Sequence, residues 1–156
     1  MDITSDSKEI PASIDACFRA VIEVESYPAW ATDVRSVQVV EHDAEGRPLK
    51  VAFRTGAFGR SASYTLLYDY SDAPHSISWS QTAGDITSKM DGRYTFDRGA
   101  NETTHVTYEL SAELIVPLPS FVKRRAEVKI IRTALDDLAE RVQSHASDEL
   151  ADGSLS

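Results

Sequence analysis

The chain has 156 residues, of which 42% are hydrophobic and 26% are charged, and its formal net charge is −9. This length and balance are typical of one folded domain and exclude a disordered chain. The acidic balance argues against a nucleic-acid partner, because phosphate binding requires clustered Lys and Arg.

Targeting and redox signals are absent from the sequence. The N-terminal segment lacks the basic and apolar regions of a secretion signal, and the one cysteine, Cys17, has no partner for an intramolecular disulfide. No segment approaches the roughly 20 apolar residues of a membrane-spanning helix. The expected location is therefore the cytoplasm.

The N-terminal third changes its hydrophobic period twice. A short edge strand is expected to end at Ile10-Pro11, because proline cannot donate to a strand ladder. Apolar residues then recur at spacings of three and four, which predicts a helix with Ser13 as N-cap that ends near Val24. Pro28, in the string YPAW, is placed to begin a second short helix.

From Ser36 onward the apolar period becomes two and is interrupted by turn residues. This pattern predicts six strands. Their short connections require antiparallel neighbours, so with the N-terminal strand we expect a sheet of about seven strands. The predicted spans are 36–43, 48–55, 61–70, 76–82, 87–97 and 103–115.

After Pro117 and Pro119, residues 120–146 carry the longest helical pattern in the chain. One apolar stripe, about 100° wide, is expected to face the core. Residues 147–156 are acidic and without period, so we predict one domain over 1–146 and a disordered tail over 147–156. The stripe consists of Phe121, Val128, Ile131, Leu135, Leu138, Ala139 and Val142.

Alternation places the large side chains of every strand on one face of the sheet, for example Tyr64, Leu66 and Tyr68, with polar residues opposite. Buried Tyr and Trp side chains need hydrogen-bond partners, which are one another, ordered water or a ligand. A curved sheet around one helix encloses more space than the helix fills, which predicts an apolar internal cavity. The alternative is a solid core in which these rings pack together.

Several strings resemble one family over nearly the whole chain. They are IPASIDACFRAVIEVESYPAWATDVRSV, YTLLYDY, ISW, DGRYTF, THVTYEL and VPLPSFVKRRAEVKIIRTALDDLAERV. The chain resembles the START-like (SRPBCC) superfamily, and within it the bacterial polyketide cyclase/dehydrase and coenzyme Q-binding group. The resemblance implies an α+β helix-grip fold, in which a curved antiparallel sheet surrounds a long C-terminal helix, and a hydrophobic ligand such as a lipid, sterol, quinone or polyketide. No catalytic signature accompanies these strings.

The predicted ligand-binding residues combine the inner strand faces, the elbow at the short helices and the last helix. Neither a metal nor a cofactor is expected, because no cluster of His, Cys, Asp and Glu has ligand spacing. The predicted set is Trp30, Phe53, Tyr64, Tyr68, Trp79, Met90, Tyr94, Tyr108, Phe121, Arg125 and Val128.

Other reactive side chains have structural interpretations. His42, His75, His105 and His145 are expected at the surface, and Cys17 as a small buried hydrophobe. Arg125 and Arg132 border the apolar stripe, where one either points its charge at a ligand carboxylate or enolate near the cavity mouth, or both snorkel or pair with Glu on the sheet.

Three functions remain open at this point. The first is binding or transport of a hydrophobic or amphipathic small molecule, such as a lipid, quinone or polyketide. The second is a polyketide cyclase or dehydratase that uses a tyrosine hydroxyl or Arg125 and needs no metal. The third is a partner-binding module, and the chain is expected to be a monomer or dimer.

The run 116–125 sets apolar residues beside Lys123, Arg124 and Arg125, which indicates either peripheral contact with an anionic membrane or a solvated first helical turn.

Overall fold

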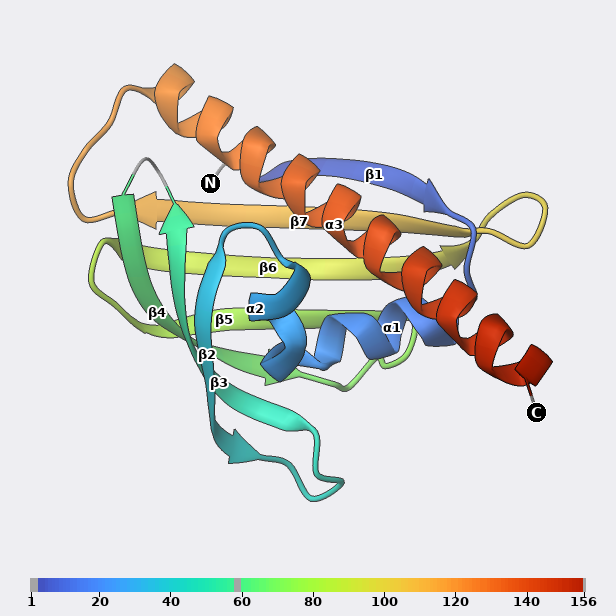
Figure 1. Ribbon diagram of the computed structural model, residues 1–156. Helices are drawn as coiled ribbons and strands as arrows, with labels where there is room; N and C mark the ends of the chain where they lie inside the picture. Colours follow the sequence, from blue (N-terminus) through green and yellow to red (C-terminus); the bar gives the residue numbers. More distant parts are fainter. Residues whose placement is uncertain (1–2, 58–59, 156) are drawn as a thin grey trace.

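The computed structural model describes residues 3–57 and 60–155, with side chains described up to Ser144 apart from Ala57. Figure 1 shows a curved sheet whose concave face is crossed by one long helix, α3, with two short helices beside it. The strands are β1 (Thr4–Ile10), β2 (Val34–His42), β3 (Pro48–Ala57), β4 (Arg60–Asp69), β5 (Ser76–Gly84), β6 (Thr87–Arg98) and β7 (Thr104–Leu114). The helices are α1 (Ile14–Ile22), α2 (Tyr27–Trp30) and α3 (Ser120–Leu155), with a 3-10 turn at Val24–Ser26.

The seven strands form one antiparallel sheet in the order β1-β7-β6-β5-β4-β3-β2. Only β1 leaves the sequential order, because it pairs with β7 at the edge of the sheet, from Thr4 opposite Leu110 to Ile10 opposite Thr104. The helix-grip fold and the seven strands predicted from the sequence are therefore confirmed. The six predicted spans of β2 to β7 each end within two residues of the observed strand ends.

Helix α1 begins where its capping chemistry predicts. The Ser13 hydroxyl accepts a hydrogen bond from the amide of Ala16 at 3.1 Å, which satisfies one of the free N–H groups of the first turn. The apolar spacing buries Cys17, Phe18 and Val21 against the sheet and α3. Pro28 lies in the first turn of α2, as expected.

Helix α3 packs against β1, β7 and α1. Its buried face is formed by Ile131, Leu135, Leu138, Ala139 and Val142, which belong to the predicted apolar stripe. Beyond this stripe, side chains of α3 reach the inward-facing polar residues of β1. Glu127 accepts from Thr4 at 3.1 Å, Arg132 donates to Asp6 at 3.3 Å, and Asp136 pairs with Lys8 at 3.1 Å.

The helix also continues further than the sequence pattern indicates. Its backbone is helical through 147–155, where the sequence predicts a disordered acidic tail. The division of the chain at residue 146 remains a prediction. Among the described helices, none is long and apolar enough to cross a membrane.

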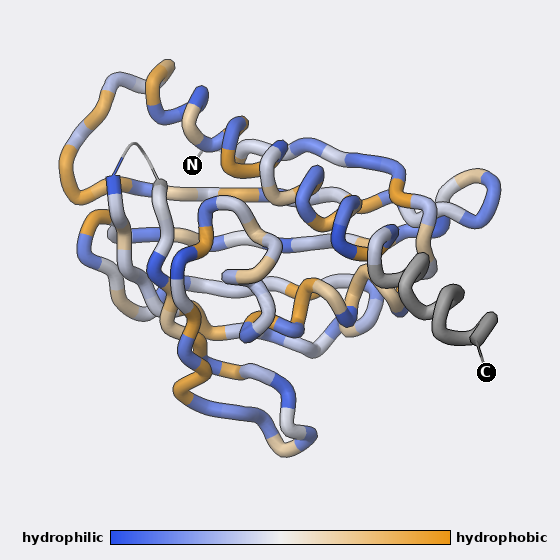
Figure 2. Tube along the Cα trace, in the orientation of Figure 1, coloured by the Kyte–Doolittle hydropathy of each residue, from blue (hydrophilic) through white to orange (hydrophobic). Residues whose placement is uncertain are grey.

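Burial in the sheet alternates along each strand, so the predicted inner face is the observed one. In β7, for example, Val106, Tyr108 and Leu110 are buried while the residues between them are half-buried. Figure 2 shows stretches of hydrophobic colour along several strands of the sheet. The concave face therefore carries the aromatic residues toward α3.

Candidate functional site

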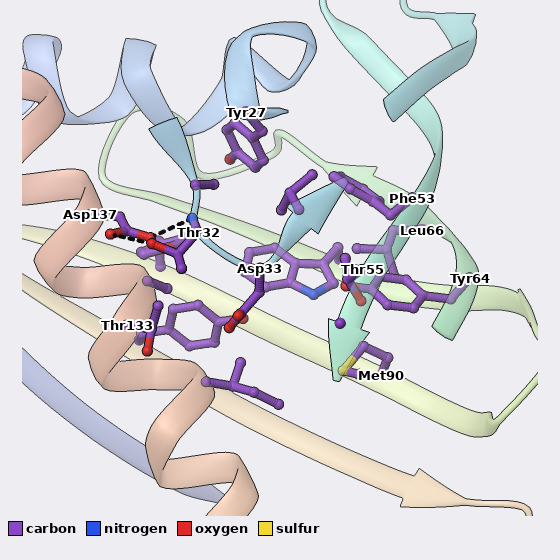
Figure 3. Close-up of a pocket in the computed structure, with 18 of the residues that line it drawn as sticks. Tyr27, Thr32, Asp33, Phe53, Thr55, Tyr64, Leu66, Met90, Thr133 and Asp137 are labelled. Atoms are coloured by element: carbon purple, nitrogen blue, oxygen red, sulfur yellow. Dashed lines mark hydrogen bonds between the residues drawn. The ribbon is translucent and has the colours of Figure 1, made fainter. Parts of the chain in front are cut away.

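A cavity lies between the concave face of the sheet, helix α3 and the segment from α2 to the start of β2. Figure 3 shows side chains converging on it from all three sides. Its volume is about 130 Å³, close to the roughly 150 Å³ of an apolar protein cavity that binds one benzene ring. The space accommodates one ring or a short chain, and a larger molecule must extend through the opening.

Eight of the eleven residues predicted from the sequence meet around this cavity. They come from α2 and from five strands, because each strand contributes the side chains that alternate onto the concave face. Their role in binding a ligand remains a prediction. The eight are Trp30, Phe53, Tyr64, Tyr68, Trp79, Met90, Tyr94 and Tyr108.

The other three predicted residues do not line the cavity. Phe121 is 68% exposed, Arg125 is exposed and Val128 is half-buried outside the lining. The reason is the length of α3, which begins well before it reaches the cavity. At about 1.5 Å per residue, Phe121 precedes Ile130, the first residue of α3 in the lining, by roughly 14 Å.

Helix α3 lines the cavity with a second stripe that the sequence interpretation missed. Ile130, Thr133, Ala134 and Asp137 lie at spacings of three, four and seven residues, so they share one side of the helix. This stripe borders the apolar one and contains small and polar side chains. The sequence signal for this lining was the presence of small residues, such as Ala134, beside the apolar stripe. Small side chains leave space between the helix and the sheet.

Four aromatic rings form the wall of the cavity on β4 to β7. Trp79 lies 5.8 Å from the ring of Tyr68 and 5.7 Å from the rings of Tyr94 and Tyr108, and the two tyrosines lie 4.6 Å apart. Gly92 is opposite Trp79 in the register of β5 and β6. A Cβ atom at Gly92 would collide with the indole ring, so glycine is required there for Trp79 to occupy this position.

The polar atoms of this wall have no protein partner. Among the described residues, none forms a hydrogen bond with the hydroxyls of Tyr68, Tyr94 or Tyr108, or with the indole N–H of Trp79, although each residue is at least nine-tenths buried. Burial raises the pKa of all three tyrosines above the ordinary value. These hydroxyls therefore stay protonated at neutral pH and are able to donate hydrogen bonds to a ligand.

Two carboxylates belong to half-buried residues of the lining, on the side that we call the opening of the cavity, and the sequence interpretation singled out neither. Asp137 of α3 accepts from the amide and the hydroxyl of Thr32, at 2.8 and 3.1 Å, so both of its oxygens hold the segment that precedes β2 (Figure 3). The backbone of Asp33 is fixed by a bond from the amide of Gly56 to its carbonyl, at 2.8 Å. The side chain of Asp33 forms no hydrogen bond or ion pair with the described residues.

Side chains expected at the surface are found there. His75 lies between Asp72 and Asp97, at 2.9 and 3.0 Å, and His105 bonds Glu9 at 2.7 Å. His42 is exposed, and the side chain of His145 lies outside the described residues. Arg132 pairs with Asp6 of β1, which supports the structural interpretation of that arginine, with an aspartate in place of the expected glutamate.

Cys17 is fully buried, and burial raises the pKa of its thiol to about 11. A thiol with this pKa is almost entirely protonated at neutral pH, so it is a poor nucleophile. The prediction of a small buried hydrophobe is confirmed. Within the described residues, no group of three or more His, Cys, Asp and Glu side chains is arranged to hold a metal ion.

Comparisons with known proteins agree with this architecture. A family model described as polyketide cyclase / dehydrase and lipid transport matches residues 1–143, which confirms the resemblance seen in the sequence strings. No curated protein matches the chain in sequence. Matches to solved structures cover nearly the whole chain.

Three of these structures illustrate the range of proteins with a similar fold. A START superfamily protein from Mycobacterium smegmatis has a TM-score of 0.85 at 20% identity, covering 91% of this chain and 97% of its own. The Zhui aromatase/cyclase from Streptomyces sp. R1128 has a TM-score of 0.80 at 12% identity, covering 93% and 95%. The major latex-like protein 151 from Panax ginseng has a TM-score of 0.70 at 12% identity, covering 90% and 96%. At these identities the likeness shows a shared fold.

Proposed function

Because the chain belongs to the polyketide cyclase/dehydrase and lipid transport family, we propose that it binds a hydrophobic or amphipathic small molecule between its sheet and α3. The observation that carries this proposal is the set of tyrosine hydroxyls that have no protein partner among the described residues, although their residues are at least nine-tenths buried. A core that simply packed its rings together would leave these polar groups unsatisfied, at a cost of about 1–3 kcal/mol each. A ligand or ordered water in the cavity removes that cost.

The test is to block the cavity from α3. Ala134 lines the cavity, so Ala134→Phe adds a ring to a space of about 130 Å³. Native mass spectrometry and organic extraction should find a small molecule on the unmodified protein that is absent from Ala134→Phe. The matched control is Ala126→Phe, on the same helix outside the lining, which should retain the molecule. Clean protein that also takes up no fatty alcohol, naphthoquinone or sterol would contradict the proposal.

A second candidate is a cyclase or dehydratase, favoured by Asp33. Its carboxylate has no partner among the described residues, and it shares the cavity with protonated tyrosines. A carboxylate and a phenol within reach of one substrate are able to act as general base and general acid. Turnover of a poly-β-ketone analogue that Asp33→Asn abolishes, with binding retained, would establish this activity. Binding without turnover would leave the carrier function.

We further propose that the protein contacts anionic membranes through the predicted segment 116–125 and the adjoining Ile115, which together we call the apolar-basic end. Ile115, Val116 and Phe121 are each more than half exposed, and Figure 2 shows hydrophobic colour in the loop before α3 and at its first turn. Arg124 and Arg125 follow, and neither has an acidic partner among the described residues. On a chain with a net charge of −9, this local excess of cations suits an anionic lipid surface.

A further inference from the structure

We propose that the cavity selects an amphiphile whose polar end is a hydroxyl or an amine, and discriminates against carboxylates. This inference rests on the proposed binding function and specifies the chemistry of the ligand. It starts from the charges of the lining. Among the described residues that line the cavity there are two aspartates, Asp33 and Asp137, and no lysine, arginine or histidine.

Asp33 is the acceptor available to a ligand, because Asp137 is occupied by Thr32. Figure 3 shows the side chain of Asp33 pointing into the cavity, toward the side on which Thr133 of α3 lies. The bond from the amide of Gly56 to the carbonyl of Asp33 holds the main chain of Asp33 in place. A hydrogen bond from a ligand O–H or N–H to this carboxylate is charge-assisted, which makes it roughly twice as strong as a neutral one.

Arg35 lies near the cavity but does not neutralise the charge of Asp33 through an ion pair. The guanidinium of Arg35 lies beside Gly56, with Nη2 3.3 Å from the position that a Cβ would take. Arg35 is exposed and forms no ion pair with Asp33. The negative charge of Asp33 therefore remains available to a donor or to a cationic ligand.

The aromatic wall, at the buried end of the cavity, determines which ligand atoms can bind there. Tyr68 and Tyr94 line the cavity and are more than nine-tenths buried, and their hydroxyls have no partner among the described residues. They are able to bind a neutral ligand oxygen or nitrogen. A ligand carboxylate fits in neither orientation, because at the opening it meets Asp33 and in the deeper end it is buried without a cation.

The test uses three probes with one chain and different heads: octylamine, octan-1-ol and octanoate. Dissociation constants would be measured at neutral pH by tryptophan fluorescence and calorimetry. We expect octylamine and octan-1-ol to bind at least roughly tenfold more tightly than octanoate, the effect of one charge-assisted hydrogen bond. Asp33→Asn should reduce the preference for octylamine over octanoate by a similar factor.

A control variant distinguishes the effect of the Asp33 carboxylate from the effect of the net charge of the protein. Glu140→Gln removes one negative charge from the exposed side of α3, outside the cavity lining, so it should leave the preference unchanged. Octanoate that binds as tightly as octylamine, or an equal effect of Asp33→Asn and Glu140→Gln, would overturn the selectivity while leaving the binding function intact. If none of the three probes binds, the selectivity fails; the binding function then stands if extraction finds another molecule bound, and fails if it does not.

Discussion

Trp79 and Asp33 show how single residues define the two ends of the cavity. Trp79 contacts three tyrosine rings, and its place on the sheet depends on the missing side chain of Gly92. Asp33 is held by its backbone and leaves its carboxylate free. The site is therefore aromatic and protonated in its depth and acidic at its opening.

His75 allows a prediction about pH at the same scale. The hydrogen bonds to Asp72 and then Asp97 raise the pKa of His75 above its usual 6.5. Because the folded pKa is the higher one, the stabilisation is complete below about pH 6.5 and is lost as the pH rises through the raised value. The melting temperature of His75→Gln should thus fall furthest below that of the unmodified protein near pH 5.5, and the gap should narrow near pH 8.5.

His42→Gln is the matched control, since His42 is exposed and has no acidic partner among the described residues. Its difference in melting temperature should be the same at both values of pH. A gap for His75→Gln that widens with rising pH would contradict the assignment.

Helix α3 is the element that joins the core to the site. One stripe packs on β1, β7 and α1, and the neighbouring stripe lines the cavity. The contact between Asp137 and Thr32 is a polar link from α3 to the segment that closes the cavity on the side of α2. Loss of this link should loosen that segment while the packed stripe holds the helix.

The corresponding prediction concerns Asp137→Ala. The variant removes both acceptors of Thr32, so the amide of Thr32 should exchange its hydrogen faster by roughly tenfold, the equivalent of one hydrogen bond. The measurement is the rate of hydrogen exchange over residues 31–34, followed by mass spectrometry in the variant and the unmodified protein. Asp136→Ala, which removes the exposed neighbour that pairs with Lys8, should leave this segment unchanged. Unaltered exchange in Asp137→Ala would show that the link does not hold the segment.

At the scale of the whole molecule, the apolar-basic end and the cavity lie along the same helix. Ile130, the first residue of α3 in the lining, lies roughly 14 Å along the helix from Phe121, so a membrane surface on which the first turn of α3 rests would be near one end of the cavity. Such proximity suits the delivery or collection of an amphiphile.

The membrane contact predicts binding to anionic vesicles. Cosedimentation with phosphatidylcholine vesicles that contain phosphatidylglycerol should exceed that with phosphatidylcholine alone and should weaken at high salt. The double variant Arg124→Gln/Arg125→Gln should bind about 30-fold more weakly, from roughly 1 kcal/mol for each cation. Phe121→Ser should also weaken binding. Val40→Ser is the control, because Val40 is 52% exposed on β2; an equal loss there would contradict a specific surface.

The sequence by itself determined the fold and most of the cavity wall. The period of two along a strand indicates which side chains share a face of the sheet. Ser13 and Pro28 indicate where helices begin, through capping and backbone geometry. Both signals are local, so they can be recognised without knowing which distant residues are in contact. The same alternation placed Tyr68, Trp79 and Tyr94 together. The strings that resemble the family gave the arrangement of sheet and helix.

Tertiary structure alone decided where α3 meets the sheet and which polar groups are left over. Phe121 and Val128 belong to the apolar stripe by period, yet the helix extends past the cavity and leaves Phe121 exposed. Asp137 and Thr32 are 105 residues apart in the chain, and no local pattern indicates that Asp137 has a partner there while Asp33 has none among the described residues. Contacts between distant segments depend on the curvature of the sheet and the crossing of the helix, and a local pattern contains neither.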